Sequence, residues 1–192
     1  MPTGRTIELT DPRALRAVAH PVRLALIGLL RREGRLTATQ AGERIGESAT
    51  TCSFHLRQLA RYGLVEEAGG GRGRERPWKA TAWFTSWPGA ARDPQLAAAV
   101  DLLNAVVAER YFEQLLAWLG RRGEDEADWQ EAAHLGDTVV YVTAEGLAAL
   151  GQQLDELLEP YSERARTGEG PRGARRVSFL HLAFPNDGTA RG

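Results

Sequence analysis

The sequence predicts a mainly α-helical fold with a small amount of β structure (α+β), divided into two regions of opposite charge. Three observations support this prediction. Apolar residues recur at helical spacing along most of the chain, glycine and proline separate these stretches, and two short β-type runs flank a glycine-rich tract. The length of 192 residues, of which 43% are apolar and 26% charged, suits one ordinary domain or a small domain with a substantial extension.

Two helices are expected at the start of the chain. Asp11 is an N-cap candidate, and Pro12 suits the first helical position, where its missing N–H costs nothing. Pro21 is expected to divide the stretch, because proline disfavours the α conformation of the preceding residue, His20. Gly34 is expected to end the second helix. The apolar row runs through Leu15, Val18, Val22, Leu26 and Leu29.

The next two predicted helices are separated by a very short turn. Thr37 and Gln40 form a capping-box pattern at the start of the third helix, and Gly46 ends it. Ser48 caps a fourth helix, which closes at Gly63. Two helices joined by a tight glycine-containing turn are the helix-turn-helix unit. The expected inward faces are Ala38, Ala41 and Ile45 on the third helix and Ala49, Cys52, Leu56 and Leu59 on the fourth.

A β-hairpin with an arginine-rich loop is predicted directly after the fourth helix. Residues 64–68 and 77–81 suit strands, and the tract 69–76 between them contains four glycines and three arginines. The glycines are typical of a hairpin tip. A disordered linker is the alternative interpretation of the same tract.

The charge distribution supports a division into a domain at 1–82, a linker at 83–93 and a C-terminal region at 94–192. Residues 1–82 carry 14 Arg and Lys against 8 Asp and Glu, a net charge of +6. Residues 83–192 carry 10 against 17, a net charge of −7. A basic first half indicates a polyanionic partner, and chance unevenness is the alternative.

The C-terminal region is expected to be helical or α+β. A long helix is predicted from Pro94 to about Gly120, strands are predicted at 138–142 and 176–184, and the helix between them starts at Thr143 and ends at Pro160. The long helix carries a near-heptad apolar row, which indicates a dimer seam or, alternatively, packing within its own domain. That row is Leu96, Val100, Leu103, Val107, Tyr111, Leu115 and Trp118.

Several classes of protein and of site are disfavoured. No apolar run reaches the ~20 residues of a membrane span, and residues 1–11 lack a signal-peptide core, so a soluble, cytoplasmic protein is expected. Cys52, the single cysteine, cannot form an internal disulfide or a zinc framework, so no metal and no cofactor are expected. Cys52 with His55 is the alternative metal pair. The common catalytic motifs do not occur, which disfavours an enzyme.

The outward side of the fourth helix and the hairpin loop together predict a double-stranded DNA interface. An α-helix fits the major groove, where small hydroxyl side chains allow close approach and an arginine reaches a guanine edge or a phosphate. Arginines on a glycine-rich tip suit phosphates or a minor groove. The expected contact residues are Ser48, Thr50, Thr51, Ser53, Phe54, Arg57 and Arg61 on the recognition helix at about 48–62, and Arg72, Arg74 and Arg76 on the wing at about 69–77.

With these residues in place, the stretch from Asp11 to Thr81 resembles the winged helix-turn-helix domain of the ArsR-type bacterial transcriptional regulators. The resemblance is carried by the LRAVAHPVRL segment at 15–24, by SFHLRQL at 53–59 and by YGLV at 62–65. It implies a homodimer that binds an inverted-repeat operator, most often as a repressor released by a signal. The third helix contains no cysteine, which disfavours thiolate metal sensing of the kind found in that family.

Three further points stay open. A winged-helix protein–protein adaptor without DNA binding is the alternative function, although three arginines on a glycine-rich tip speak against it. The C-terminal region is expected to serve dimerisation, and a small-molecule effector of unknown identity is a further hypothesis. The aromatic residues Trp78, Trp83, Phe84, Trp87, Tyr111, Phe112 and Trp118 indicate either core packing or an apolar ligand pocket near the linker.

Overall fold

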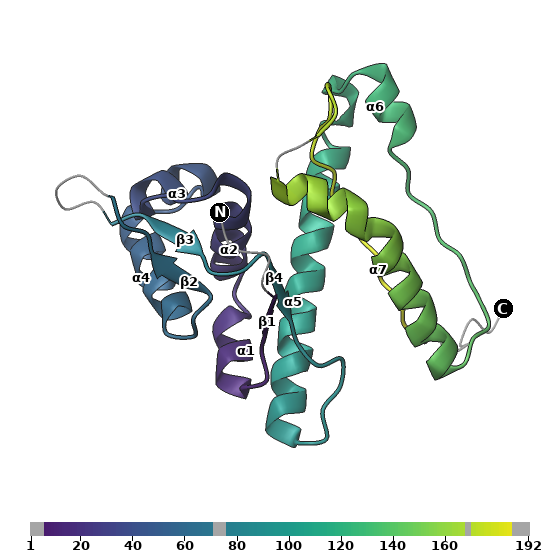
Figure 1. The fold of residues 1–192 in the computed structure, drawn as a ribbon, viewed down its shortest axis with the longest axis horizontal. Helices are drawn as coiled ribbons and strands as arrows, with labels where there is room; N and C mark the ends of the chain where they lie inside the picture. The colour runs from purple at the N-terminus through teal and green to yellow at the C-terminus, as the bar shows by residue number, and fades with distance from the viewer. Residues whose placement is uncertain (1–5, 71–75, 168–169, 186–192) are drawn as a thin grey trace. The chain divides into compact units, whose positions relative to one another are not determined.

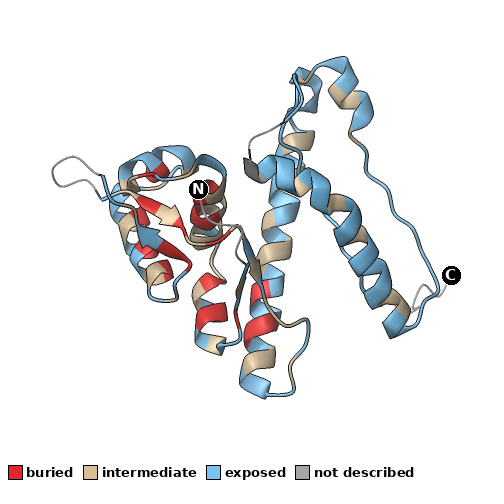
Figure 2. Cartoon of the chain, viewed as in Figure 1, coloured by how far each residue is buried: buried red, intermediate tan, exposed pale blue. Residues whose placement is uncertain are grey.

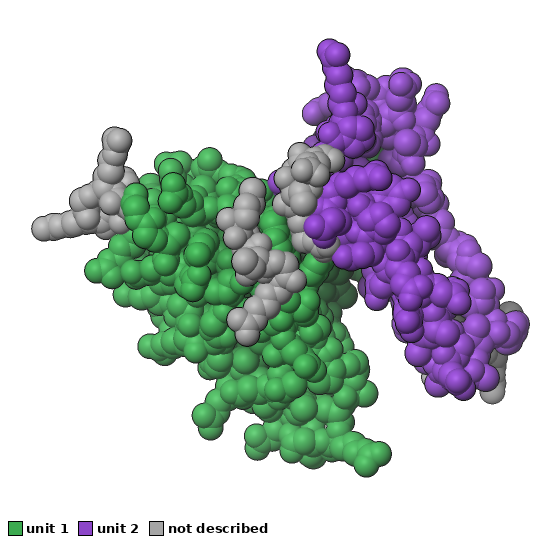
Figure 3. Space-filling model, viewed as in Figure 1, with its two compact units in different colours: residues 1–120 green, residues 121–192 purple. Residues whose placement is uncertain are grey.

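The computed structural model describes residues 6–70, 76–167 and 170–185. The chain divides into two compact units, residues 1–120 and 121–192 (Figure 3). Both units are mainly helical and the sheets are small, which confirms the predicted α+β class (Figure 1). The first unit contains β1 (Thr6–Glu8), α1 (Pro12–Val18), α2 (Pro21–Glu33), α3 (Ala38–Ile45), α4 (Ala49–Ala60), β2 (Val65–Glu67), β3 (Trp78–Ala80), β4 (Phe84–Ser86) and α5 (Pro94–Leu119), and the second contains the 3-10 turn η1 (Arg122–Glu124), α6 (Ala127–Ala132) and α7 (Ala144–Thr167).

The starts of the first helices follow the predicted capping signals. Asp11 accepts a hydrogen bond from the Arg13 N–H at 2.8 Å, and Pro12 occupies the first turn of α1. Pro21 begins α2 as predicted, and the ring of His20 caps it by accepting the Val22 N–H at 3.2 Å. These caps satisfy backbone donors that a helix leaves free at its first turn.

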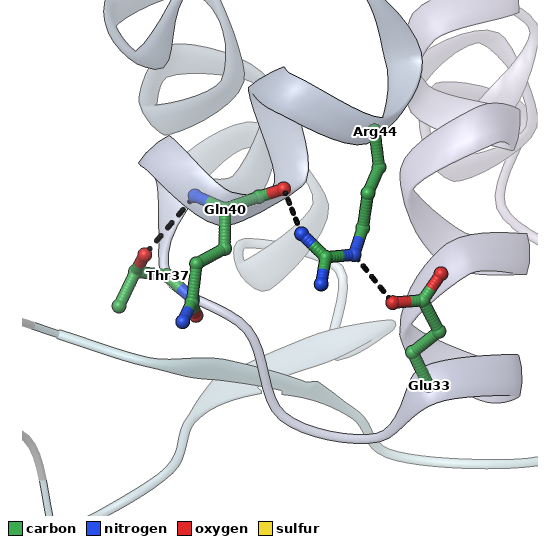
Figure 4. A network of polar contacts seen from close by, with 4 residues as sticks. All are labelled: Glu33, Thr37, Gln40 and Arg44. Atoms are coloured by element: carbon green, nitrogen blue, oxygen red, sulfur yellow. Dashed lines mark hydrogen bonds and ion pairs between the residues drawn. The ribbon is translucent and has the colours of Figure 1, made fainter.

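A capping box fixes the start of α3. Thr37 Oγ1 accepts the Gln40 N–H at 3.2 Å, and Gln40 Oε1 accepts the Thr37 N–H at 2.9 Å. Arg44 joins this network by donating to the Gln40 carbonyl and pairing with Glu33 at the end of α2 (Figure 4). The network therefore links α2 to both turns of α3 by local polar contacts.

The turn between α3 and α4 is short because Gly46 adopts the left-handed conformation, with φ of 75°. Glycine adopts this conformation without the steric cost that a Cβ would add. The Gly42 carbonyl accepts hydrogen bonds from the N–H groups of Gly46 and Glu47, at 2.9 and 3.0 Å. The chain therefore folds back over Gly42 before Ser48 starts α4.

The buried residues lie in the first unit (Figure 2). Helices α1, α2, α4 and α5 each contribute two of the large side chains that are fully enclosed, and Cys52 of α4 is buried among them. Burying a leucine side chain contributes roughly 1.5–3 kcal/mol to the stability of the fold, so these enclosed side chains hold the helices together. The largest enclosed side chains are Leu15, Val18, Leu26, Leu30, Leu56, Leu59, Leu64, Val65, Val100 and Leu103.

The predicted hairpin is present as β2 and β3, which pair antiparallel with Val65 opposite Ala80. A second small sheet, not predicted, pairs β1 parallel to β4 with Ile7 opposite Thr85. Arg31 holds β4 on α2 by donating to the Ala82 carbonyl at 2.9 Å and to Thr85 Oγ1 at 2.7 Å. Burial lowers the pKa of Arg31 to about 10.

Helix α5 belongs to the first unit. It packs on α1 through Ala99, Val100 and Leu103, with Leu96 and Val107 at the margin of the core. The predicted linker at 83–93 contains β4, and the unit runs on to Gly120. The first half of the predicted apolar row is therefore used within its own unit, as the alternative interpretation had it.

Three predictions for the second unit are wrong. Residues 138–142 and 176–184 form no strand, because a strand needs a neighbouring backbone and neither segment hydrogen-bonds to the backbone of another described residue through its own backbone. Pro160 does not end the helix, since α7 continues from it to Thr167. A proline within a helix removes one backbone donor, and the helical conformation of α7 continues on both sides of Pro160.

A substitution at Gly42 tests the close turn between α3 and α4. In Gly42→Ala the new methyl group would overlap the Glu47 carbonyl oxygen, which is backbone and cannot swing away. We expect the overlap to outweigh the gain in helix propensity and to lower the free energy of unfolding by about 1–3 kcal/mol. Urea unfolding measures this change. Gly89→Ala is the matched control because its Cβ meets open space; equal stability of the two variants would contradict the close turn.

Candidate nucleic-acid interface

Helix α4 has one buried side and one exposed side. Cys52, Leu56 and Leu59 are fully enclosed in the core. Ala49 was predicted to join them and does not: it is exposed, because it is the first residue of α4 and lies beyond the edge of the core. The opposite side of α4 is a stripe at steps of four, three and four, which we call the exposed stripe: Thr50, Phe54, Arg57 and Arg61.

The start of α4 is fixed by its own hydroxyl groups. Ser48 Oγ accepts the Thr51 N–H at 3.0 Å and lies 2.8 Å from Thr51 Oγ1. Ser48 therefore caps α4, as predicted, and Thr51 takes part in the same cap. Both residues were also predicted to contact DNA. Ser53 is half-buried between the exposed stripe and the core side.

The exposed stripe carries two arginines without a carboxylate partner in the described part of the chain. Arg57 Nε donates to the Ser53 carbonyl one turn earlier at 3.1 Å, which aligns the guanidinium along α4 and leaves its terminal nitrogens free of carboxylates. Arg61 is exposed at the C-terminal end of the helix. Phe54, a large apolar ring, is 51% exposed.

Of the three arginines predicted on the hairpin loop, only Arg76 lies within the described residues. Arg72 and Arg74 lie outside them. Arg76 is exposed and pairs with Glu67 across the hairpin, at 3.2 Å, and Lys79 pairs with Glu66 at 3.0 Å. The cations at the base of the hairpin are thus partly neutralised, which sequence spacing did not reveal.

A contact at the base of the hairpin was missed from the sequence. Leu36 forms an isolated antiparallel bridge with Trp78, closed by N–H···O bonds of 3.0 and 2.8 Å. This bridge brings Arg35 to the hairpin, where its guanidinium donates to the Gly69 carbonyl at 3.5 Å. One paired residue is too short to show the alternation that announces a strand, so no sequence signal was available.

A cavity of about 430 Å³ lies at the same base. Its lining mixes the apolar Leu30 and Ala68 with the charged Arg35, Glu67 and Lys79. No residue of the predicted aromatic group lines it, and Trp87 instead packs against the core and donates to Asn104 Oδ1 at 2.9 Å. Core packing therefore accounts for Trp87.

Behind the exposed stripe, two histidines lie in contact where α2 begins. The rings of His20 and His55 have centroids 4.5 Å apart, and His55 is only 8% exposed. Arg23 Nε and His55 Nδ1 are buried without a hydrogen-bond partner among the described residues. Burial, and then the charge of Arg23, lowers the pKa of His20, while Glu47 acts in the opposite direction. Burial, His20 and Arg23 lower the pKa of His55 in that order.

Within the described ranges no group of three or more His, Cys, Asp or Glu is placed to hold a metal ion. Burial and the nearby Glu47 raise the pKa of the Cys52 thiol, which disfavours the thiolate that metals bind. No helix in the described parts of the chain has the length and apolar character needed to cross a membrane.

Comparison with known proteins identifies the domain. Residues 18–68, from the end of α1 to just past β2, match the family model of a helix-turn-helix domain. The crystal structure of a "Possible transcriptional regulator for arsenical resistance" is 27% identical over 55% of this chain and 94% of that chain, with a TM-score of 0.32. No curated protein matches the sequence. The chain thus contains a helix-turn-helix domain, as predicted, and such domains bind DNA through their second helix.

The histidine pair predicts a loss of stability in acid. Since the pKa values of His20 and His55 are lowered in the folded chain from 6.5, the unfolded chain binds more protons once the pH falls through that value. The free energy of unfolding should therefore fall as the pH decreases through 6.5, and it should keep falling until both histidines are protonated in the folded chain, as urea titrations would measure.

A double variant isolates this effect. His20→Asn keeps a capping acceptor for α2 and His55→Gln keeps a polar group, while both remove the titration. The double variant should show a flatter dependence of stability on pH, whereas His134→Asn, at an exposed position, should follow the unmodified protein. Equal pH dependence in all three proteins would rule the pair out as its source.

Proposed function

We propose that the protein is a sequence-specific DNA-binding transcriptional regulator of the ArsR-like type, acting as a homodimeric repressor on an inverted-repeat operator. The observation that carries the proposal is the exposed stripe on α4, the second helix of the helix-turn-helix. Its core side is fully enclosed, so the stripe is the side presented outward. The basic charge of residues 1–82 supports a polyanionic partner.

In this proposal α4 enters the major groove, with its N-terminal half toward the bases. Thr50, Thr51 and Ser53 are small enough for close approach, and Ser48 fixes the N-terminus of the helix, whose dipole favours a phosphate. Arg57 is held along the helix by its bond to Ser53, an arrangement that preorganises it for a guanine edge or a phosphate. Phe54 offers an apolar surface to a thymine methyl group, and Arg61 a cation to the backbone.

The hairpin is the proposed wing. Arg72 and Arg74 are proposed to contact phosphates or a minor groove, and they add affinity and orientation rather than sequence reading. Arg76 is the weaker contributor, because Glu67 already holds it. The bridge between Leu36 and Trp78 fixes the base of this wing to the end of α2.

The proposed dimer uses the side of α5 that does not pack on α1. Leu102, Phe112 and Leu116 are exposed there, and Tyr111 is at the margin. A two-fold dimer would hold two copies of α4 about one DNA turn apart, roughly 34–36 Å, which matches an inverted repeat. We further propose that a signal releases the protein from its operator. We also propose that the protein is cytoplasmic and catalyses no reaction.

Fluorescence anisotropy tests DNA binding. A labelled duplex from the protein's own upstream region is titrated beside a scrambled duplex, at about 50 and about 200 mM salt. The proposal predicts tighter binding to the native duplex and a steep loss of affinity with salt, because bound cations release counterions from DNA. Absence of binding at both salt concentrations would favour the winged-helix adaptor instead.

Arg57→Ala tests the reading of bases. Removing a guanidinium that contacts a base should cost about 1–3 kcal/mol of binding free energy and relax the preference for the native duplex; a phosphate contact would give uniform weakening on both duplexes. Arg92→Ala is the control, since Arg92 is an exposed arginine of the same unit outside the helix-turn-helix. Equal affinities of the two variants would remove Arg57 from the interface, and unchanged binding by an Arg57/Arg72/Arg74 triple alanine variant would refute the proposal.

The ion pair between Arg76 and Glu67 predicts an ordered series. Arg76→Ala should weaken DNA binding less than Arg74→Ala, because Glu67 already pairs with Arg76 and partly neutralises its charge. Arg74→Ala should lower affinity and reduce the slope of affinity against salt by about one unit. The same anisotropy titrations measure both, and a larger loss from Arg76→Ala would contradict this division of roles.

A further inference from the structure

The second unit has no core of its own in the described residues. No residue of 121–165 or 170–185 is buried, whereas the first unit encloses a continuous apolar cluster (Figure 2). The large apolar side chains of the second unit are exposed instead. They are Leu135, Val139, Val140, Tyr141, Val142, Leu150, Leu157, Tyr161, Val177, Phe179, Leu180, Leu182 and Phe184.

Two segments of this set have the composition of strands and lack partners. Residues 137–142 and 176–184 are rich in β-branched and aromatic side chains, and Val139 and Val177 are 71% and 69% exposed. Their backbone groups make no hydrogen bond to another described backbone group. Unpaired backbone groups in a segment of strand composition form an open edge, on which a strand from another chain can pair.

Helix α7 presents an apolar row beside them. Leu147, Leu150, Leu154, Leu157 and Tyr161 recur at steps of three and four along one side of the helix, and Leu157 is 65% exposed. A row of this spacing normally faces another protein surface. Helix α7 and the segments 137–142 and 176–184 therefore all expose apolar surface within the second unit.

The amount of this surface matches a stable homodimer. Thirteen large apolar side chains, about half exposed at roughly 150 Å² each, give on the order of 1,000 Å² per copy, above the ~800 Å² per partner of a standard interface. Interfaces that are this apolar are typical of permanent partners, chiefly second copies of the same chain.

Charge complementarity indicates how two copies would fit. Segment 137–142 begins with Asp137 and segment 176–184 begins with Arg176, and neither side chain has an ion-pair partner among the described residues. Parallel pairing sets these two charges side by side. The start of the second segment is anchored, because Arg175 pairs with Asp125 at 2.7 Å and lies over the Trp129 ring.

We propose that a second copy of this chain completes the second unit by reciprocal strand exchange. Residues 137–142 of each copy pair in parallel with residues 176–184 of the other, and the paired strands cover the apolar row of α7. The arrangement is isologous, since each copy gives and receives the same segment. This inference rests on the proposed function for its two-copy state and adds an interface separate from α5.

Disulfide capture on the full-length chain tests the exchange. Asp137→Cys and Arg176→Cys variants, carrying different tags, are co-expressed and mildly oxidised, with the native Cys52 buried and out of reach. We expect a covalent dimer from the mixture and none from either variant alone, as seen on a non-reducing gel. Glu131→Cys with Arg176→Cys is the matched control and should stay uncoupled.

Two results would overturn the proposal. One is the absence of an interchain disulfide in the mixture. The other is an intrachain disulfide in the Asp137→Cys/Arg176→Cys double variant at high dilution, which would show that the segments pair within one copy. Sedimentation adds a second readout: Phe179→Asp should raise the dimer dissociation constant at least tenfold, whereas Gln153→Asp, with the same added charge on an exposed site of α7, should leave it unchanged.

DNA binding by the same variants separates this inference from the proposed function. A reciprocal disulfide in a protein that binds no DNA would leave the exchange standing and remove the regulator. Binding of the native duplex by a chain that never forms the disulfide would support the regulator and exclude the strand exchange. Charged substitution of Phe112 in α5 distinguishes the two interfaces, because it should not affect the disulfide between 137 and 176.

Discussion

The close crossing of α3 and α4 is the constraint on which the rest of the helix-turn-helix surface depends. Gly42 lets the backbone of Glu47 pass directly over α3, and Gly46 turns the chain in a left-handed conformation. Ser48 can then start α4 with its Cys52, Leu56 and Leu59 row in the core. Once that row is buried, helical geometry alone sends Thr50, Phe54, Arg57 and Arg61 outward.

The same packing brings together polar groups that lie far apart in the sequence. The His20 ring caps α2 and lies against the His55 ring of α4, with Arg23 nearby, so α2 and α4 share a contact between two histidines whose pKa values are lowered by burial. The hairpin is tied to this frame twice, by Leu36 to Trp78 and by the Thr81 hydroxyl to the Gly63 carbonyl. The described residues of the second unit include none that is buried, so they form no comparable enclosed frame within one chain.

Local signals in the sequence predicted the helices well, and non-local pairing was beyond them. Asp11, Thr37 and Ser48 specify helix starts because each side chain bonds its own first turn. The pairing of β1 with β4 joins residues nearly eighty positions apart through three-residue strands, too short for any periodic pattern. Residues 138–142 have strand composition without a strand partner. On α4, the helical period correctly predicted that Arg57 is exposed and Leu56 is buried. It did not predict that His55 is buried against His20 while the neighbouring Phe54 is exposed.

Amide hydrogen exchange with and without the native upstream duplex tests the central claim, that the outward side of α4 and the hairpin form the DNA interface. We expect slower exchange at the start of α4 and in β2 and β3 when DNA is bound, with the scrambled duplex giving a smaller effect at the same concentration. Slower exchange confined to residues 121–192, or unchanged exchange throughout α4 at saturating DNA, would contradict it.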